Sequence, residues 1–306
     1  MNKKNAPLLV VGTVAIDGIE TPFGKKDSCF GGSASYFSYA ASFFTPVKLN
    51  AVIGEDFPKE YRKVLEERPI DLSSLEVKKG GKTFHWKGSY EFDMNTAKTR
   101  ETQLNVLQDF DPKLQTGDEF EFVFLANVDP VIQLKLLKQV SKKSLRWIAA
   151  DTMNFWIDHK KSDLLQVLER INMIVLNDGE ARQLTGEPNL IKAGRKIQSM
   201  GPGVVVIKKG EHGALLFHEE FFFALPAYPC ETVFDPTGAG DSFAGGLIGY
   251  ITKTGDLSFE NFKRAVAYGS VVASFTVEDF SLDRLRRLTN SEIEERYEVF
   301  KKLLKF

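Results

Sequence analysis

Cysteine and histidine are scarce in this sequence of 306 residues, which contains two cysteines and four histidines. Cys29 and Cys230 fit neither a paired metal-ligand motif nor the framework of a disulfide-rich fold. The histidines show no metal-ligand spacing, and no Ser/His/Asp nucleophile elbow occurs. We therefore expect neither a zinc site nor a serine hydrolase, and the low cysteine content suits a reducing, cytoplasmic location.

A dominant charge and long hydrophobic runs are also missing. The 40 basic and 41 acidic residues give a formal net charge of -1, which provides no strong field for a nucleic acid or an anionic membrane. No apolar run approaches the length of a membrane span, and the run at 8–16 is followed by Asp17 without the cleavage site of a signal peptide. We expect a small molecule as the partner, with no nucleic acid and no membrane.

The chain does have enough apolar residues for a large core, 43% of the total, and an alternation of strand-like and helix-like segments. Short apolar runs predict strands of a buried parallel sheet, and the longer runs between them predict helices. The expected strands are 8–16, 47–53, 120–128, 146–150, 173–176, 204–207 and 214–217, and the expected helices are 34–44, 56–67, 130–141, 163–170, 179–184, 190–200 and 292–305. This order predicts a single α/β domain, 1–306, with a doubly wound, mostly parallel sheet that is flanked by helices and binds ligands beyond the carboxyl ends of its strands.

One segment, at about 79–107, breaks this alternation. Residues 83–86 and 89–92 alternate polar and aromatic side chains with the period of a strand. We interpret the segment as a small β insertion within the domain. Its aromatic side chains could line a substrate or a subunit contact, or they could fill the small sheet itself; they are Phe84, Trp86, Tyr90 and Phe92.

The most informative stretch is 235–246, DPTGAGDSFAGG, which precedes an apolar helical run through residue 251. Gly238 and Gly240 allow a tight turn that points successive amide hydrogens at one spot, and the following helix adds its positive N-terminal end. These features predict an anion hole. Asp241 places a carboxylate beside it, where it can accept the proton of a hydroxyl that attacks a phosphoryl group. Taken alone, the same residues could be a Gly-rich turn whose aspartate stabilises a helix start.

The full stretch resembles the C-terminal signature of the ribokinase-like family, also called the PfkB family of carbohydrate kinases. The resemblance implies the ribokinase-like fold, and transfer of a phosphoryl group from ATP to a hydroxyl of a sugar or sugar-like molecule, with magnesium as the cofactor. It implies that Asp241 is the catalytic base and that Gly238, Ala239 and Gly240 form the anion hole. The insertion at 79–107 resembles the family's β lid, which covers the acceptor and in several members pairs with a second subunit, so a homodimer through the lid is an option.

Two segments near the N-terminus resemble the parts of the family that bind the acceptor of the phosphoryl group. Residues 11–17, VGTVAID, resemble the family's first strand, whose terminal aspartate binds sugar hydroxyls; that residue is Asp17 here. Gly31 and Gly32 resemble the N-terminal Gly-Gly signature, where the substrate lies against bare backbone. Many sugar kinases of the family have Asn four residues after the second glycine, but this chain has Tyr36, so ribose specificity does not follow.

Two further candidates for the acceptor site follow predicted elements. Ser33 comes directly after the two glycines, and together with an aromatic lid it could accommodate a nucleobase. Asp151 ends a predicted strand on the ligand-binding side, where it could touch the acceptor or support a residue that does.

Two loops that follow predicted strands resemble the parts of the family that bind the nucleotide. Residues 177–180, NDGE, resemble the family's Asn-x-x-Glu element, which organises magnesium and the waters around the phosphates. Residues 208–213, KKGEHG, resemble the segment that contacts the nucleotide. The resemblance implies ATP-binding roles for Asn177, Lys208, Gly210, Gly213, Thr237 and Gly240, magnesium held through water by Asn177 and Glu180, and a monovalent cation, K+ in ribokinase itself, at Asp235.

Other readings of the sequence are weaker. A Walker-type phosphate loop before Lys82 fails because Glu76 stands where its first glycine belongs, and a dinucleotide fingerprint fails because Phe243 replaces its third glycine. The same family phosphorylates nucleosides, so a nucleoside kinase is an open alternative to a carbohydrate kinase. A non-catalytic ligand-binding protein with this fold is a third reading, and Asp241 argues against it because such a protein needs no base.

Overall fold

The main sheet forms the centre of the computed structural model, which describes residues 7–92 and 94–305. Its strand order is β14-β13-β12-β11-β10-β9-β1-β4-β5, and β6 pairs with β4. The strands are β1 (Leu8–Val11), β4 (Val47–Gly54), β5 (Ile70–Asp71), β6 (Leu75–Lys78), β9 (Phe122–Leu125), β10 (Trp147–Asp151), β11 (Met173–Asn177), β12 (Val204–Lys208), β13 (Ala214–His218) and β14 (Phe221–Leu225). Pairing is parallel from β12 to β5 and β6, and antiparallel at β13 and β14.

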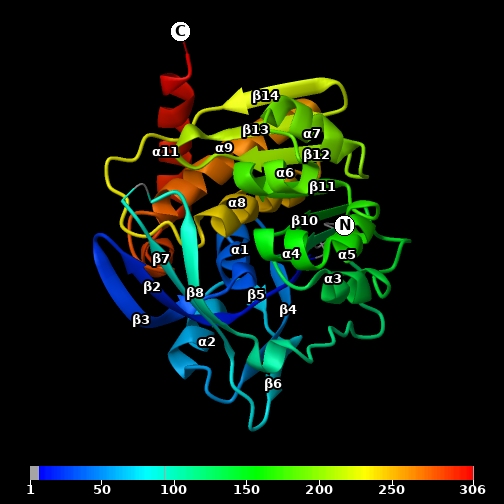
Figure 1. Ribbon diagram of the computed structural model, residues 1–306, viewed down its shortest axis with the longest axis vertical. Helices are drawn as coiled ribbons and strands as arrows, with labels where there is room; N and C mark the ends of the chain where they lie inside the picture. Colours follow the sequence, from blue (N-terminus) through cyan, green and yellow to red (C-terminus); the bar gives the residue numbers. More distant parts are fainter. Residues whose placement is uncertain (1–6, 93, 306) are drawn as a thin grey trace.

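Helices cover both faces of this sheet, as Figure 1 shows. One face carries α1 (Ser33–Ala41), α2 (Lys59–Glu66), α8 (Ala239–Thr254), α9 (Phe259–Thr276), α10 (Asp283–Arg286) and α11 (Asn290–Leu303). The other carries α3 (Pro130–Leu137), α4 (Asn154–His159), α5 (Lys161–Leu168), α6 (Asp178–Thr185) and α7 (Leu190–Gln198). Strand β1 explains the continuous apolar runs, because Leu8 and Val10 enter one core while Leu9 and Val11 enter the other. The predicted fold class is confirmed.

A second sheet of four strands, the lid sheet, lies beside the main one. Its strands, in the order β3-β2-β7-β8, are β2 (Ala15–Thr21), β3 (Gly24–Gly31), β7 (Phe84–Tyr90) and β8 (Ala97–Gln103). The short helix η1 (Asn105–Leu107) follows β8. The lid sheet therefore combines two strands from the start of the chain with two from the expected insertion at 79–107.

The structure corrects two of the expected elements. The single strand expected at 8–16 is wrong, because β1 ends at Val11 and the chain enters the lid sheet at Ala15. Both segments are buried, so hydrophobicity alone did not reveal the change of sheet. The glycine-rich residues 29–33, CFGGS, predict a turn before the helix expected at 34–44; this prediction is also wrong, since β3 continues to Gly31 and α1 begins at Ser33.

Glycines in α8 allow this helix to lie directly against α1. A Cβ atom at Gly245 would lie 2.5 Å from the carbonyl oxygen of Phe37 and 2.7 Å from the Cβ of Ala40. The same glycine-lined contact holds the start of α8, and the loop before it, in a fixed place on the main sheet. Among the described residues, none of the helices combines the length and hydropathy that a bilayer crossing requires.

We predict that Gly245→Ala destabilises the protein by about 1–3 kcal/mol, the usual range for overpacking, which exceeds the roughly 1 kcal/mol that alanine gains in helix propensity. The measurement is the urea midpoint of unfolding. Gly203→Ala is the matched control, because a Cβ there meets no atom within 4 Å. Equal midpoints for the two variants would contradict close packing at Gly245.

Candidate active site

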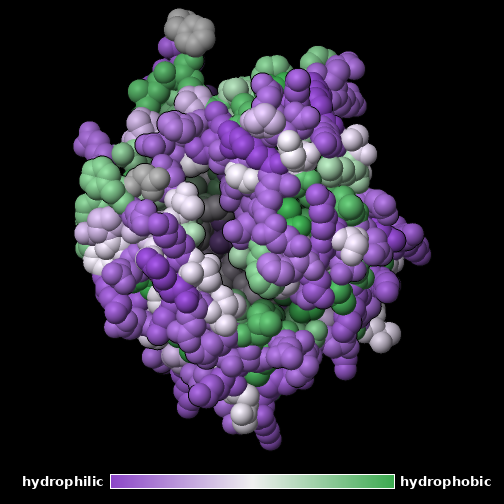
Figure 2. Space-filling view, in the orientation of Figure 1, coloured by the Kyte–Doolittle hydropathy of each residue, from purple (hydrophilic) through white to green (hydrophobic). Residues whose placement is uncertain are grey.

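Neighbouring strand ends bring acidic residues and one lysine together. Strands β10, β11 and β12 run parallel and end at Asp151, Asn177 and Lys208. Helix α8 adds Asp241 in its first turn, and the lid strand β2 adds Asp17. Figure 2 shows that this face of the molecule is hollowed between the lid sheet and helix α4, over the region where α8 begins. The candidate active site lies in this hollow.

The loop before Asp241 has a shape that requires glycine. Gly238 is the N-cap of α8 and has a φ of 74°, in the left-handed region. A Cβ there would lie 2.3 Å from the ring of Tyr36, which is buried below the loop. A Cβ at Gly240 would lie 2.7 Å from the Nζ of Lys208. The loop therefore presents bare backbone at the helix N-terminus, with a lysine amine beside it, as an anion-binding site does.

The charge of Lys208 offsets part of the cost of burying three carboxyl groups. Burial raises the pKa of Asp241, and the lysine amine opposes this shift. Burial raises the pKa of Asp151 well above its usual range; Asp241 adds to the shift, and Lys208 opposes it. Burial raises the pKa of Glu180 to about 7, again against the effect of Lys208. A carboxyl group with a raised pKa is a better proton acceptor, which suits Asp241 as a base.

The two expected magnesium residues form the capping box that begins α6. The Oδ1 atom of Asn177 accepts a hydrogen bond from the Glu180 amide at 2.8 Å, and the Oε2 atom of Glu180 accepts one from the Asn177 amide at 2.7 Å. The described residues contain no group of three or more His, Cys, Asp or Glu side chains that could ligate a metal directly. The buried Oδ1 atom of Asp151 has no hydrogen-bond partner in the described chain. This donor set fits a magnesium ion that keeps most of its waters.

Asp17, the expected acceptor residue, is buried, and its carboxyl group is only partly satisfied by hydrogen bonds. Its side chain is 4% exposed, its Oδ2 atom accepts a hydrogen bond from the Gly32 amide at 3.3 Å, and its buried Oδ1 atom lacks a partner among the described residues. A Cβ at Gly31 would lie 1.8 Å from Oδ2, so only glycine leaves room for the carboxylate. Burial raises the pKa of Asp17 to about 8; the Gly32 amide opposes the shift, and the carboxylates of Asp235 and Asp241 add to it.

The hydroxyl of Ser33, another expected acceptor residue, is engaged within the protein. It lies 3.0 Å from the Oγ1 atom of Thr13 and donates to the carbonyl of Asn127, also at 3.0 Å. The serine therefore joins the end of β1, the start of α1 and the segment after β9. The loop expected to contact the nucleotide lies between β12 and β13, where Gly210 and Gly213 have φ angles of 55° and 83°.

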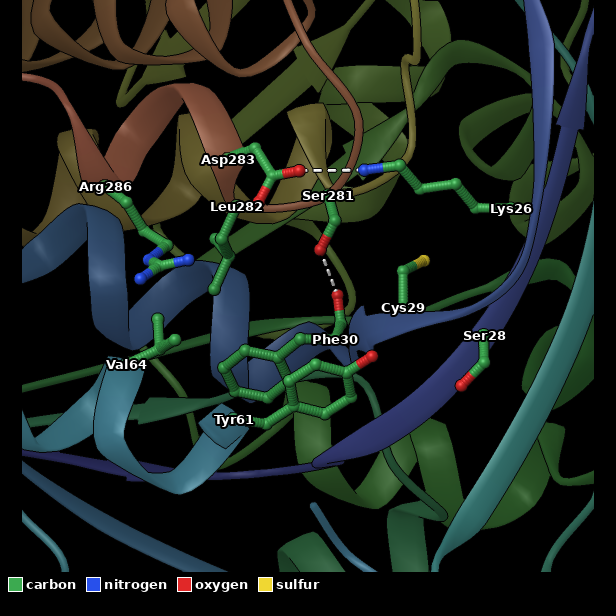
Figure 3. A pocket seen from close by; sticks show the side chains of 10 residues that line it. All are labelled: Lys26, Ser28, Cys29, Phe30, Tyr61, Val64, Ser281, Leu282, Asp283 and Arg286. Atoms are coloured by element: carbon green, nitrogen blue, oxygen red, sulfur yellow. Dashed lines mark hydrogen bonds and ion pairs between the residues drawn. The ribbon is translucent and has the colours of Figure 1, made fainter. Parts of the chain in front are cut away.

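The buried carboxylate of Asp235 supports the expected anion-hole loop, residues 236–240, from behind. It accepts hydrogen bonds from the amides of Thr237 at 2.9 Å and Ser281 at 3.1 Å. The Ser281 hydroxyl donates to the carbonyl of Phe30 in β3, as Figure 3 shows. Figure 3 shows a cavity of about 300 Å³ whose lining includes Phe30 and Ser281. None of the acidic residues at the strand ends lines this cavity.

From the sequence alone, Tyr90 is one of four aromatic side chains of the β insertion, with no role for its hydroxyl. The structure brings it to the anion-hole loop, where it accepts a hydrogen bond from the Thr237 hydroxyl at 3.3 Å. The two residues lie 147 positions apart in the chain. A tyrosine in an alternating β segment carries no signal of this contact, so only the fold reveals it.

Comparison with known proteins gives a consistent assignment. The sequence pattern of the pfkB family carbohydrate kinases matches residues 29–285. A cytidine kinase of Thermococcus kodakarensis is 31% identical over 250 residues, which are 79% of this chain and 88% of that protein. A nucleoside kinase of Methanothermobacter thermautotrophicus is 25% identical over 301 residues, 89% of each chain. The crystal structure of the Methanocaldococcus jannaschii nucleoside kinase, at 20% identity, aligns with a TM-score of 0.77 and covers 97% of this chain and 100% of its own.

The fold and the matched pattern define a ribokinase-like kinase. The chain belongs to the pfkB family of carbohydrate kinases. It is an enzyme, an ATP-dependent phosphotransferase whose acceptor is an alcohol group.

The raised pKa of Asp17 predicts a pH-dependent stability. Between pH 3.8, the usual pKa of an aspartate, and about 8, the folded protein holds a proton on Asp17 that the unfolded chain releases. Unfolding therefore releases a proton in this window, and stability falls as the pH rises through it, by up to about 1.4 kcal/mol per pH unit for one group.

We expect Asp17→Asn to stabilise the ligand-free protein, and to do so more at pH 8 than at pH 5.5. Urea unfolding at both pH values measures the difference. Asp109→Asn, which changes an exposed aspartate, is the control and should keep the pH slope of the wild type. A slope for Asp17→Asn equal to that of the wild type would show that Asp17 is not buried as a neutral acid.

Proposed function

We propose that this enzyme is a nucleoside kinase, which transfers the γ-phosphoryl group of ATP to a ribose hydroxyl with Asp241 as the general base. One observation carries the chemical part of the proposal: a carboxylate with a raised pKa stands beside glycine backbone at a helix N-terminus, next to a lysine amine. The relatives support the choice of acceptor, since a cytidine kinase and a nucleoside kinase match over 79% and 89% of this chain.

In the proposed reaction Asp241 accepts the proton of the acceptor hydroxyl while the hydroxyl oxygen bonds to the γ-phosphorus of ATP. The bond between that phosphorus and the bridging oxygen breaks, and ADP leaves with the electron pair. Amides of Gly238, Ala239 and Gly240, with the amine of Lys208, stabilise the charge on the transferred group. These groups are already in place, so they need little reorganisation when the reaction occurs.

Magnesium, when bound with ATP, neutralises charge on the phosphates. Asp151 and Glu180 would hold it through water, because Asp151 has an unpartnered oxygen and Glu180 uses only Oε2 in its capping box. Asp235 is the proposed monovalent-cation residue. Its carboxylate accepts hydrogen bonds from the amides of Thr237 and Ser281, so an ion bound to Asp235 would help to hold the anion-hole loop in position.

The acceptor would be seated by Asp17 and the adjacent glycines. The unpartnered Oδ1 atom of Asp17 can accept hydrogen bonds from sugar hydroxyls, and Gly31 and Gly32 let a sugar ring approach the backbone. Binding of a hydroxyl would also satisfy a carboxyl oxygen whose burial is otherwise unfavourable.

We predict that ATP consumption by the purified enzyme, with magnesium and with or without potassium, responds to nucleosides. The panel contains cytidine, uridine, adenosine and inosine, together with ribose, fructose and inositol at the same concentrations. Turnover should be at least about tenfold faster with one or more nucleosides than with any free sugar or polyol, because a pocket built around a base loses those contacts with a bare sugar. Turnover with free sugars alone would replace the nucleoside proposal by a sugar kinase.

We predict that Asp241→Asn lowers kcat at least about 10²-fold, the lower end of general-base contributions, while ATP binding persists. The amide keeps the shape of the side chain but cannot accept the proton. Calorimetric titration with ATP provides the control for an intact nucleotide site. Turnover within a few-fold of the wild type would exclude Asp241 as the base.

A further inference from the structure

We propose that Tyr90 is a further catalytic residue, which donates a hydrogen bond from the lid to the phosphoryl group during its transfer. The proposal rests on the phosphoryl transfer described above and adds to it a group from the lid sheet. The anion hole would then consist of backbone amides at the start of α8, the amine of Lys208 and one phenol hydroxyl. The third component would be present only when the lid is in place.

The direction of one hydrogen bond supports this role. The Thr237 hydroxyl donates to the oxygen of Tyr90 at 3.3 Å, so the phenol acts as acceptor in that bond. In the part of the chain that the structure describes, Thr237 is the hydrogen-bond partner of this hydroxyl. The phenol hydrogen therefore has no acceptor within the described protein and is free for a ligand. A hydroxyl that already accepts a hydrogen bond is also polarised into a better donor.

The surroundings of Tyr90 keep it a donor. The side chain is partly buried, and burial raises the pKa of Tyr90 far above its ordinary value; the carboxylates of Asp235, Asp17 and Asp241 add to the shift. The phenol thus stays protonated over the working pH range of an enzyme.

The transferred phosphoryl group is the partner that this donor suits best. A hydrogen bond donated to the acceptor hydroxyl would occupy a lone pair of the oxygen that must attack phosphorus, which would weaken the nucleophile. A hydrogen bond to a phosphoryl oxygen stabilises charge where catalysis requires it. Position agrees with this choice, because Thr237, which holds the phenol, immediately precedes Gly238 at the N-cap of α8.

A second contact holds the same lid hairpin against the nucleotide loop. The Nδ2 atom of Asn95, between β7 and β8, donates to Glu211 at 3.2 Å. A Cβ at Gly210 would lie 2.6 Å from the Oδ1 atom of Asn95, so the hairpin packs closely on that loop. The hairpin thus touches both loops that surround the expected phosphates, and this fixes the position of Tyr90. An open lid would leave the anion hole without one donor, which would slow the reaction of ATP with water.

The test is Tyr90→Phe, which removes only the hydroxyl. We expect kcat for phosphorylation to fall at least about tenfold, because loss of one oxyanion donor typically costs 10²–10³-fold. The KM values for ATP and for the acceptor should stay within about threefold, since the lost bond forms in the transition state. Tyr61→Phe is the matched control: it removes a phenol hydroxyl from a tyrosine that stacks on Phe30, outside the candidate site, and should leave kcat unchanged.

A merely structural role for Tyr90 predicts a different pattern. If the hydroxyl only holds the lid closed, Tyr90→Phe should raise the acceptor KM and the rate of ATP hydrolysis without acceptor, while kcat stays the same. An unchanged kcat, with or without these other effects, overturns the proposal. Thr237→Val alone and combined with Tyr90→Phe completes a double-mutant cycle. Because the two hydroxyls act as a unit, we expect the combined loss to be smaller than the product of the two separate losses.

A binding measurement separates this proposal from the choice of acceptor. Magnesium, ADP and aluminium fluoride mimic the phosphoryl group in transfer without any acceptor. We expect Tyr90→Phe to weaken binding of this complex at least about tenfold while binding of ADP alone is unchanged; equal affinity of both proteins for the complex overturns the proposal. If the wild type phosphorylates no nucleoside, the nucleoside assignment fails, and the fluoride complex still decides the role of Tyr90.

Discussion

Several buried carboxyl groups share one lysine, and the architecture of this enzyme depends on that arrangement. Asp151, Glu180 and Asp241 come from three different elements, and the charge of Lys208 acts on each of them. Isolated carboxylates are expensive to bury, so they persist here only because the parallel strands end at the same edge and bring a cation to the same point. The sheet thus holds close together carboxyl groups that repel one another.

The burial of these carboxyl groups affects the stability of the protein as well as its activity. Acidic groups with raised pKa values weaken the folded protein near neutral pH, and the two cores on either side of the sheet must compensate. The Oδ1 atoms of Asp17 and Asp151 have no hydrogen-bond partner among the described residues. A protein of this design gains stability when its ligands arrive, because they supply the missing cations and hydrogen bonds.

Much of this architecture was predictable from the sequence, because the signals were local. The main strands β1, β9, β10, β11, β12 and β13 are short, mostly apolar runs. The loop from Asp235 to Asp241 encodes its turn, its glycines and its acidic residues within seven neighbouring positions. The change of sheet after Val11 was not predictable, since both strands are buried and apolar. Strand β14 was also missed, although its residues, FFFAL, form an apolar run; the structure places Phe221 and Phe222 exposed at the edge of the sheet.

Contacts between segments that lie far apart in the chain could not be predicted from the sequence. The nearness of Lys208 to Gly240 depends on how β12 and α8 meet, and the packing of Tyr36 under Gly238 depends on how α1 meets α8. The departure from the family's usual residue at Tyr36 was visible in the sequence. Its position directly beneath the anion-hole loop was not, because residue type does not specify a partner two hundred positions away.

The link made by Ser281 has a consequence for the synthesis of the protein. This residue joins Phe30, 251 positions earlier, to Asp235, and Thr21 reaches the carbonyl of Phe234 across 213 positions. Strand β2 pairs with β3 and with β7, all early in the chain, but Thr21 and Phe30 gain these further hydrogen bonds only after residues 234 and 281 have been made. The link between β3 and the loop before α8 therefore forms late in translation, and an interrupted synthesis that stops before residue 281 yields a chain without it.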